Sequence, residues 1–265
     1  MITLSNLNEL GGIRHAFFTR EGGVSEGLYA SINCSFGSDD DPGKVARNRE
    51  IALAALALPP DALVTGYQVH SPDVAVVKKP WRREDAPKVD GLVTDRPGIA
   101  LGVLTADCVP VLLADGKAGL IGAAHAGWRG AKAGIIGAVV DAMCELGADR
   151  DSIRAGIGPA IAQRSYEVGP EFPALILGRP LGSGEASSDT GLEDGLFAPS
   201  RRPGHFMFNL IGYVLQRCAE AGVTHCRRTP CDTCKEEDRF FSYRRSVLRG
   251  ESDYGRSLSA IVLNR

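Results

Sequence analysis

Two nearly continuous apolar runs in the middle of the chain constrain its fold more than any other feature. GIALGVLTA spans residues 98–106 and GLIGAAH spans 119–125. Their lengths suit β-strands, and the near-absence of polar alternation predicts that both faces of each strand are covered. The runs DALVTGYQV (61–69), VPVLLAD (109–115) and LSAIVLN (258–264) predict three further strands. Strands covered on both faces are typical of α/β proteins, in which helices supply covering layers.

Three segments have helical features. A helix is expected from 42 to 58, where two prolines follow, and another over 127–147, where apolar residues recur at the helical period before a terminal glycine. A third is expected over 208–221. The alternation of strands and helices, without a second core composition, favours a single α/β domain over residues 1–265.

The segment 178–204 is the exception to this pattern. It is polar, rich in Gly, Ser and Pro, and shows no periodicity. Such composition is typical of irregular structure, so we expect a surface loop there and not a domain boundary.

The charge balance argues against two classes of partner. Thirty basic and 32 acidic residues nearly cancel, and no long run of like charge occurs, so neither a nucleic acid nor a membrane surface is expected as a partner. The N-terminus lacks the pattern of a secretory signal. Seven cysteines, an odd number, fit a reducing compartment, so we expect a cytoplasmic protein. Nothing in the sequence fixes an oligomeric state.

Three side chains of metal-binding type stand where apolar runs end or are interrupted. His70 closes VTGYQVH, Cys108 lies within GVLTADCVPVLL, and His125 closes GLIGAAH. Taken singly, a histidine or cysteine at such a place more often has a structural role than a metal-binding one. Together, two imidazoles and a thiolate form a zinc-type ligand set that leaves one coordination position open for water or substrate, as catalytic zinc sites do. Copper is a second candidate metal, because it competes for the same ligands.

The neighbours of these residues add to the hypothesis. Asp107 adjoins Cys108 and is a candidate to orient a ligand or to transfer a proton. Gly127 allows close approach of the backbone to a ligand. Arg129 lies in the first turn of the predicted helix 127–147, where backbone N–H groups and the helix dipole favour anions.

Arg49 falls on the apolar face of the helix predicted over 42–58, whereas Arg47 lies on the opposite side. A buried arginine needs a partner, because an unpaired buried charge is unfavourable. The sequence leaves two interpretations open, a structural salt bridge or an anion-binding arginine.

Two other motifs carry weaker signals. The run C-x4-C-x2-C, formed by Cys226, Cys231 and Cys234, has too few cysteines for an iron–sulfur cluster. Its CDTC part could be a redox pair or a partial zinc knuckle, and the alternative is that all three cysteines shape the loop before FFSYRR. In the motif FFSYRR, Arg244 and Arg245 with Tyr243 could bind an anion or stack on a base, and a solvated basic turn is the alternative.

A different mechanism uses the same central residues. Cys108 could act as a nucleophile with His125 as its base, which would make the protein a thiol hydrolase or amidase. A third hypothesis is a binding or redox partner protein, without turnover, in which the metal is structural. No Walker A loop or G-x-G-x-x-G motif occurs.

Taken together, the motifs resemble the YfiH or laccase-domain family, formerly described as multicopper polyphenol oxidases and now as purine nucleoside phosphorylases. The matching stretches are TREGGVSEGLYASIN, NRE, QVHS, VDGLVT, LTADCVPVLL, AHAGWRG, GIGPAI with YEVG, FFSYRR and the following GR. They cover nearly the whole chain in order, and TADCVPVLL with AHAGWRG is a highly specific pair.

The resemblance implies a layered α/β/β/α sandwich with mixed β-sheets. It also implies a set of site residues, with zinc held by His70, Cys108 and His125 and a pocket that includes Asn33, Arg49 and Arg129. One departure concerns the segment after SIN, where Gly37 stands at a position at which the family usually has a histidine that contacts the nucleoside.

The activity implied is phosphorolysis of adenosine, inosine and methylthioadenosine to base and ribose 1-phosphate, with adenosine deamination as a second activity. The older oxidase description is harder to accommodate, because a multicopper oxidase needs a separate copper cluster held by many histidines. The chain has five histidines in all. Copper-dependent phenol oxidation is therefore expected to be adventitious.

Overall fold

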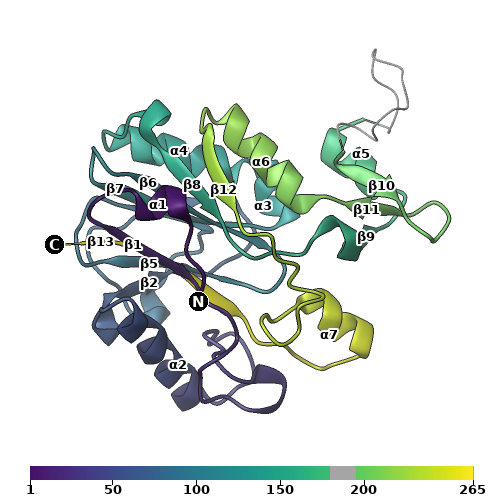
Figure 1. Cartoon of the computed structure of the whole chain (residues 1–265), viewed down its shortest axis with the longest axis horizontal. Helices are drawn as coiled ribbons and strands as arrows, with labels where there is room; N and C mark the ends of the chain where they lie inside the picture. The colour runs from purple at the N-terminus through teal and green to yellow at the C-terminus, as the bar shows by residue number, and fades with distance from the viewer. Residues whose placement is uncertain (180–194, 265) are drawn as a thin grey trace.

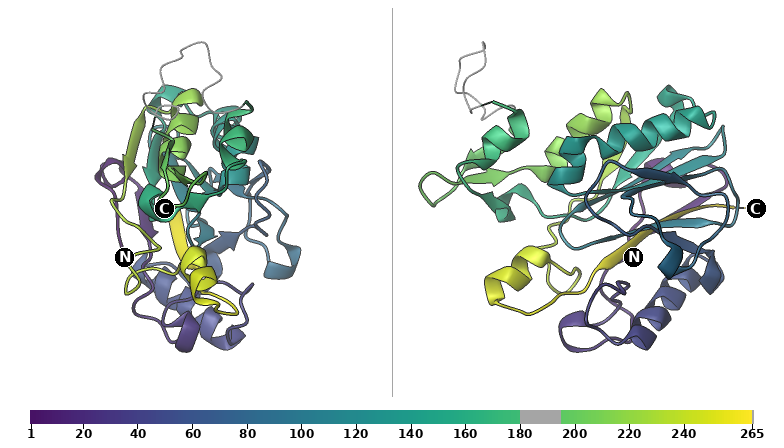
Figure 2. Two further views of the ribbon diagram at one scale, coloured as in Figure 1. Left: turned by 90° about the vertical axis from the view of Figure 1, so that its right-hand side faces the viewer. Right: turned by 180° about the vertical axis from the view of Figure 1, so that it is seen from behind.

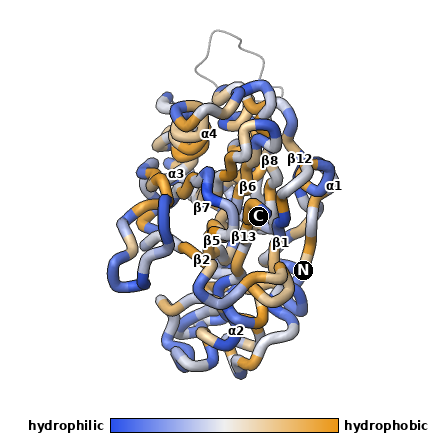
Figure 3. The backbone as a smooth tube through the Cα atoms, turned by 90° about the vertical axis from the view of Figure 1, so that its left-hand side faces the viewer, coloured by the Kyte–Doolittle hydropathy of each residue, from blue (hydrophilic) through white to orange (hydrophobic). Residues whose placement is uncertain are grey.

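The computed structural model describes residues 1–179 and 195–264. Two β-sheets face each other in the middle of the molecule, and helices cover the outer face of each (Figure 1). This arrangement is the expected α/β/β/α sandwich with mixed sheets, in a single domain. The strands of both sheets carry much of the apolar sequence (Figure 3).

The larger sheet has six strands in the order β12-β8-β6-β7-β4-β3. Antiparallel pairs β6–β7, β4–β7 and β6–β8 form its centre, and parallel pairs β3–β4 and β12–β8 form its edges. The strands are β3 Val74–Val76, β4 Gly91–Thr94, β6 Val109–Asp115, β7 Leu120–Ala126, β8 Arg154–Ile157 and β12 His225–Arg228.

The smaller sheet has four strands in the order β1-β13-β5-β2. Their bounds are β1 Ile13–Phe17, β2 Leu63–Thr65, β5 Ala100–Thr105 and β13 Ser257–Leu263. Leu101 and Ile261 of this sheet meet Leu112 and Ile121 of the larger sheet in one buried cluster. Burial of these side chains between the sheets provides much of the driving force that holds the two layers together.

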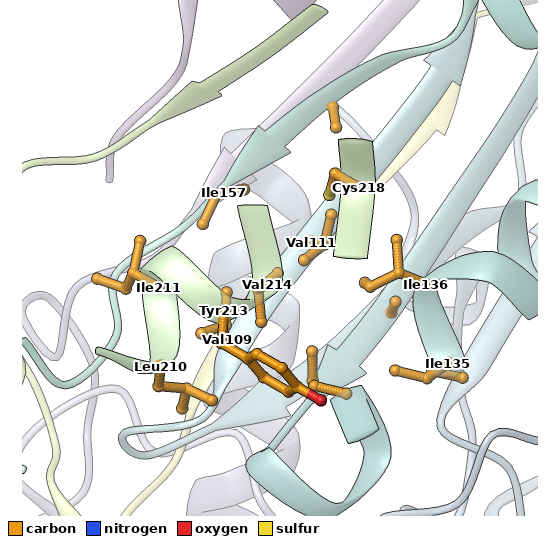
Figure 4. Packing of buried hydrophobic residues seen from close by; sticks show 14 of the residues in the cluster. Val109, Val111, Ile135, Ile136, Ile157, Leu210, Ile211, Tyr213, Val214 and Cys218 are labelled. Carbon is orange, nitrogen blue, oxygen red and sulfur yellow. The ribbon is translucent and has the colours of Figure 1, made fainter. Parts of the chain in front are cut away.

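Helices cover the outer faces of the sheets. Helix α2, Pro42–Ala55, packs outside the smaller sheet and begins at Asp41, whose side chain accepts a hydrogen bond from the backbone N–H of Lys44. On the other side lie α3 Trp128–Ala133, α4 Ile135–Glu145 and α6 Leu210–Glu220. Side chains of α4 and α6 pack on β6 and β8 in a second apolar core (Figure 4).

Smaller elements complete the described chain. A three-stranded sheet and α5, Phe172–Leu177, project together at one end of the molecule (Figure 2). That sheet consists of β9 Glu167–Val168, β10 Phe197–Pro199 and β11 Phe206–Phe208. The remaining α-helices are α1 Ser5–Asn8 and α7 Tyr243–Arg249, and short 3-10 helices lie at Gly27–Tyr29, Pro60–Ala62, Arg83–Asp85, Arg150–Ser152 and Gln163–Ser165. No helix within residues 1–179 or 195–264 is long and apolar enough to cross a membrane.

Most predicted elements are present, with two corrections. The strand predicted over 109–115 matches β6 residue for residue, whereas only Leu63–Thr65 of the strand predicted over 61–69 is extended in a sheet. The helix predicted over 127–147 is two helices, because Gly134 adopts φ 98° and ends α3 before α4 begins.

The predicted loop 178–204 lies mostly outside the described residues, which omit 180–194. In the described remainder the prediction of irregular structure is wrong at one place. Phe197–Pro199 forms β10, which pairs with β11 because Phe197 packs into the apolar core beside Phe208.

Candidate metal centre and its cavity

Three side chains predicted as metal ligands lie together. The Nε2 atom of His70 is 3.8 Å from the Sγ atom of Cys108, and the ligand atoms of these two residues and His125 all lie within 4.8 Å of one another. Cys108 directly precedes β6, and His125 lies in β7 opposite Pro110. The antiparallel pairing therefore brings two ligands together, while His70 arrives from the loop that follows β2.

The geometry of the three groups fits a metal ion. Tetrahedral zinc with bonds of about 2.0–2.3 Å has ligand atoms roughly 3.3–3.8 Å apart, and the separation of His70 and Cys108 falls at that limit. Gly127 leaves the space open, because a Cβ atom there would lie 2.6 Å from Cδ2 of His70 and 3.0 Å from Sγ of Cys108. A metal could therefore be held by these three residues.

The backbone is constrained at the same place. His70 has φ 63° and Asp107, next to Cys108, has φ 85°. Non-glycine residues rarely adopt this left-handed region, which costs on the order of 1 kcal/mol or more, and such residues cluster at functional sites. Contacts around the centre must hold these two residues in place.

Asp90 supplies several of those contacts. Its carboxylate is 1% exposed and lies 2.7 Å from Nδ1 of His125. Its other oxygen accepts hydrogen bonds from the backbone N–H groups of Val69 and Ser71, at 3.0 and 2.8 Å. With Nδ1–H of His125 directed at Asp90, Nε2 is the nitrogen of that ring left to bind a metal, which would take the place of its proton.

The ionisation of the centre is strongly perturbed. Burial disfavours the thiolate of Cys108, but the adjacent His125 and His70 outweigh it and lower the pKa of the thiol to about 6. Burial likewise disfavours the imidazolium of His125, yet Cys108 and Asp90 raise its pKa to about 9. A thiolate at neutral pH is the form that binds a metal or acts as a nucleophile.

A cavity of about 360 Å³ opens beside the three ligands, all of which line it. Three arginines line the same cavity: Arg49 from α2, Arg83 from the loop between β3 and β4, and Arg256 directly before β13. Within the described parts of the chain, none of the three forms a salt bridge with a carboxylate. Arginines that form no salt bridge and line a cavity favour an anionic ligand.

Each arginine is anchored by hydrogen bonds to residues 34–37, and Arg256 has two of them, to Ser35 and Gly37. Nε of Arg49 donates to the carbonyl of Cys34 at 2.8 Å, and Nη2 of Arg83 donates to the carbonyl of Phe36 at 2.9 Å. Nη1 of Arg256 donates to Oγ of Ser35 at 3.2 Å. The other guanidinium nitrogens keep donors for a ligand. Of the two interpretations of Arg49, the salt bridge is therefore wrong for the described residues.

Aromatic side chains complete the lining. The guanidinium groups of Arg49 and Arg83 lie 4.6 and 4.9 Å from the centroid of the Phe36 ring. Arg256 lies 4.3 Å from the ring of Tyr254, and Tyr67 stands 62% exposed at the same cavity. The cavity therefore combines positive charge with flat apolar surfaces, which suits a ligand that is both aromatic and anionic or is bound with an anion.

Asp107 lies differently from the expectation. Its buried carboxylate accepts hydrogen bonds from Oγ1 of Thr233, Oγ of Ser242 and the backbone N–H of Arg244, at 2.6 to 2.9 Å. These bonds fix the start of α7 and direct the carboxylate away from the ligands, and Asp107 does not line the cavity. The contact that orients a candidate metal ligand, which the sequence assigns to Asp107, belongs to Asp90.

Asn33 is also placed differently from the expectation. It is fully buried, and its amide is used within the protein: Nδ2 donates to Ser38 and Asp40, and Oδ1 accepts from the backbone N–H groups of Ser35 and Arg256. It does not line the cavity. Asn33 therefore shapes the loop that carries three lining residues, Ser35, Phe36 and Gly37, and its side chain has no free group to contact a substrate.

Arg129 and Gly37 complete the set of predicted pocket residues. Arg129 is exposed, lies 4.5 Å over the Trp128 ring and is not among the lining residues. Gly37 does line the cavity, and a Cβ atom there would meet only Oγ of Ser35, at 3.6 Å. The glycine therefore leaves open space where the family resemblance implies a histidine.

The cysteine motif forms no metal site among the described residues, where His70, Cys108 and His125 are the one cluster of metal-ligating groups found. Cys231 and Cys234 are buried and free, and burial raises the pKa of both thiols. A loop-shaping role fits Cys231 and Cys234, whereas Cys226 lies in strand β12 and not in a loop.

The FFSYRR motif is also structural in part. Arg245 is buried and donates to the backbone carbonyls of Thr233, Cys234 and Phe240. Arg244 donates to the carbonyl of Glu167. Neither arginine lines the cavity, so neither the anion site nor the solvated turn describes Arg245.

Three residues of the site were not singled out from the sequence: Asp90, Arg83 and Arg256. Asp90 lies in VDGLVT and Arg256 in GR, two stretches that carry the family resemblance but indicate no role for either side chain. Arg83 lies in the charged stretch WRREDAPK, where sequence alone cannot distinguish a lining arginine from a solvated one.

Comparisons with known proteins agree with this geometry. The family described as "Multi-copper polyphenol oxidoreductase laccase" matches residues 14–264. A purine nucleoside phosphorylase of Streptomyces griseus is 43% identical over 91% of this chain and 92% of its own length. Another, of Deinococcus radiodurans, is 40% identical over 89% of this chain and 85% of its own.

A solved structure supports the same assignment. The crystal structure of the Bacillus licheniformis hypothetical protein YfiH is similar with a TM-score of 0.84 and 31% identity, covering 97% of this chain and 94% of that one. The chain therefore belongs to the multi-copper polyphenol oxidoreductase laccase family, whose relatives include proteins named purine nucleoside phosphorylase.

Proposed function

We propose that this protein is a zinc-dependent purine nucleoside phosphorylase that converts adenosine, inosine or methylthioadenosine, with phosphate, to the free base and the sugar 1-phosphate. One observation carries the proposal: three potential metal ligands and three arginines without carboxylate partners line one cavity of about 360 Å³. The relatives named purine nucleoside phosphorylase support the reaction class.

The arginines are the proposed phosphate site. In phosphorolysis a phosphate oxygen forms a bond to C1′ of the sugar, the C1′–N9 bond breaks, and its electron pair goes to the purine. Arg49, Arg83 and Arg256 can hold the phosphate dianion beside a sugar that becomes cationic in the transition state. Burial and the adjacent Arg83 lower the pKa of Arg49 to about 10, so it remains a cation at neutral pH.

His70, Cys108 and His125 are the residues that would hold the metal. Two imidazoles and one thiolate match the ligand set of catalytic zinc, which supplies Lewis acidity at a fourth, open position. Copper could occupy the same ligands. The family description points to copper chemistry, but the described residues contain one such cluster and not the several that a multicopper oxidase needs.

The aromatic residues are the proposed contacts for the base. Phe36, Tyr67 and Tyr254 line the cavity and offer ring faces on which a purine can stack. The open space beside Gly37 leaves room for a substituent on the sugar at the place where the family's usual histidine would lie.

The decisive test is an assay of metal-analysed protein with adenosine, in the presence and absence of phosphate. We expect adenine and ribose 1-phosphate only when phosphate is present. Adenosine converted to inosine without phosphate would instead support the deaminase activity of the same cavity. Neither product from adenosine, inosine or methylthioadenosine would overturn the proposal.

A thiol hydrolase is the second candidate, and the lowered pKa of Cys108 beside His125 favours it. The two are distinguished by a chelator. A metal enzyme loses activity when its metal is removed and regains it with zinc, whereas a thiol hydrolase keeps its activity until Cys108 is alkylated.

A further inference from the structure

We propose that Asp90 is a positioning residue that fixes two of the three metal ligands, His70 and His125, in the arrangement that binds the ion. The proposal rests on the metal site proposed above but not on the phosphorylase reaction. It concerns how tightly the protein holds a metal, which is measured without any substrate.

The link to His125 is double. Oδ1 of Asp90 is 2.7 Å from Nδ1 of His125, and the backbone carbonyl of Asp90 accepts from the backbone N–H of His125 at 2.8 Å. Both side chains are buried, at 1% and 4% exposure. The side-chain bond selects the tautomer with the proton on Nδ1 and fixes the plane of the ring, so that Nε2 presents its lone pair to the metal.

The link to His70 runs through the backbone. Oδ2 of Asp90 accepts from the N–H groups of Val69 and Ser71, at 3.0 and 2.8 Å, and lies 3.3 Å from Oγ of Ser71. These residues flank His70, which is exposed and belongs to no helix or strand. Its φ of 63° is unfavourable for a histidine. The paired hydrogen bonds on either side provide the restraint that keeps His70 in this conformation.

One carboxylate therefore joins a buried strand to an exposed loop. His125 takes its position from the pairing of β6 with β7, whereas His70 has no sheet to hold it. Asp90, directly before β4, is itself held by main-chain bonds, since its N–H donates to Asp73. Through its side-chain hydrogen bonds, Asp90 fixes the loop that carries His70 relative to the sheet. Four acceptor contacts leave neither of its oxygens unsatisfied, which makes a buried carboxylate acceptable at this place.

The test replaces Asp90→Asn, a change that keeps shape but removes acceptor capacity. An amide has one oxygen, so it can accept from His125 or from the N–H groups of Val69 and Ser71, but not from both sides. Whichever way the amide turns, one ligand loses its support. We expect zinc affinity, measured by competition with a chromogenic chelator, to fall by roughly 10- to 100-fold.

Asp115→Asn is the matched control. Asp115 is equally buried and accepts from the backbone N–H groups of Lys117, Ala118 and Asp149, at the end of β6 away from Cys108. It reports the general cost of losing a buried carboxylate. Zinc affinity should be unchanged in this variant. An equal loss in both variants, or wild-type affinity in Asp90→Asn, would overturn the proposal.

A measurement on the unmodified protein covers the case in which Asp90→Asn does not fold. With ¹¹³Cd in place of zinc, nitrogen NMR should show the metal coupled to Nε2 of His125, and Nδ1 should carry a proton protected from exchange. Coupling to Nδ1, or rapid exchange of that proton, would contradict the proposed role of Asp90. Both readouts remain valid if the protein shows no phosphorolysis, so the two proposals can fail separately.

Discussion

Replacing Gly127 with alanine tests whether the space beside His70 and Cys108 is the space in which a metal is held. Gly127 has φ −71° and ψ 166°, which any residue adopts, so the substitution introduces no backbone strain. Its effect is steric. The new Cβ would lie 2.6 Å from Cδ2 of His70, and the ring must retreat by about 0.8 Å to reach the 3.4 Å at which ordinary contact begins.

That retreat is large on the scale of metal coordination, where ligand distances are kept within about 0.2 Å. Overpacking of this kind costs roughly 1–3 kcal/mol. If the cost falls on the metal-bound arrangement, zinc binds about 5- to 150-fold more weakly, because 1.4 kcal/mol is a factor of ten. The assay is chelator competition, with urea unfolding of the metal-free protein to separate affinity from stability.

Gly130→Ala, one turn along the same helix, is the matched control. Its Cβ would meet no atom closer than 3.5 Å, which is ordinary contact. Alanine also favours a helix over glycine by about 0.5–1 kcal/mol, so this variant should be at least as stable as the wild type and bind zinc normally. If Gly127→Ala binds zinc as tightly as Gly130→Ala, the cavity beside His70 is not the metal site.

Three further predictions follow from the site. Arg49→Lys should raise the KM for phosphate by roughly tenfold or more, because lysine cannot replace a guanidinium fork; Arg47→Lys, on the exposed side of α2, should leave the KM unchanged in the same steady-state assay. In metal-free protein, alkylation of Cys108 by iodoacetamide should slow as the pH falls through about 6, the pKa of its thiol, and zinc should protect the thiol at every pH. A rate that already falls as the pH drops through about 9, the ordinary pKa of a thiol, would contradict the lowered pKa. Asp107→Asn should lower the free energy of unfolding by about 1–3 kcal/mol, because it weakens the hydrogen bonds that fix the start of α7. Its zinc content, determined by metal analysis, should equal that of the wild type, and loss of zinc would instead indicate a role for Asp107 at the metal.

The sequence by itself determined five of the strands that form the core, and it singled out the three candidate metal ligands that the fold brings together. An apolar run such as 109–115 predicts a strand directly, because a strand buried on both faces contains few polar residues. Cys108 and His125 interrupt or end such runs, and strands that pair antiparallel bring their ends together. The local pattern was enough for these features.

Only the tertiary structure decided which charged residues serve the site. Asp90 and Asp107 are both aspartates next to buried strands, yet one carboxylate faces a metal ligand and the other faces α7. Arg83 and Arg129 are both exposed, yet only Arg83 lines the cavity. The direction of a side chain depends on backbone torsion and on partners distant in the chain, such as Ser242 for Asp107. A local pattern of residues does not identify such partners.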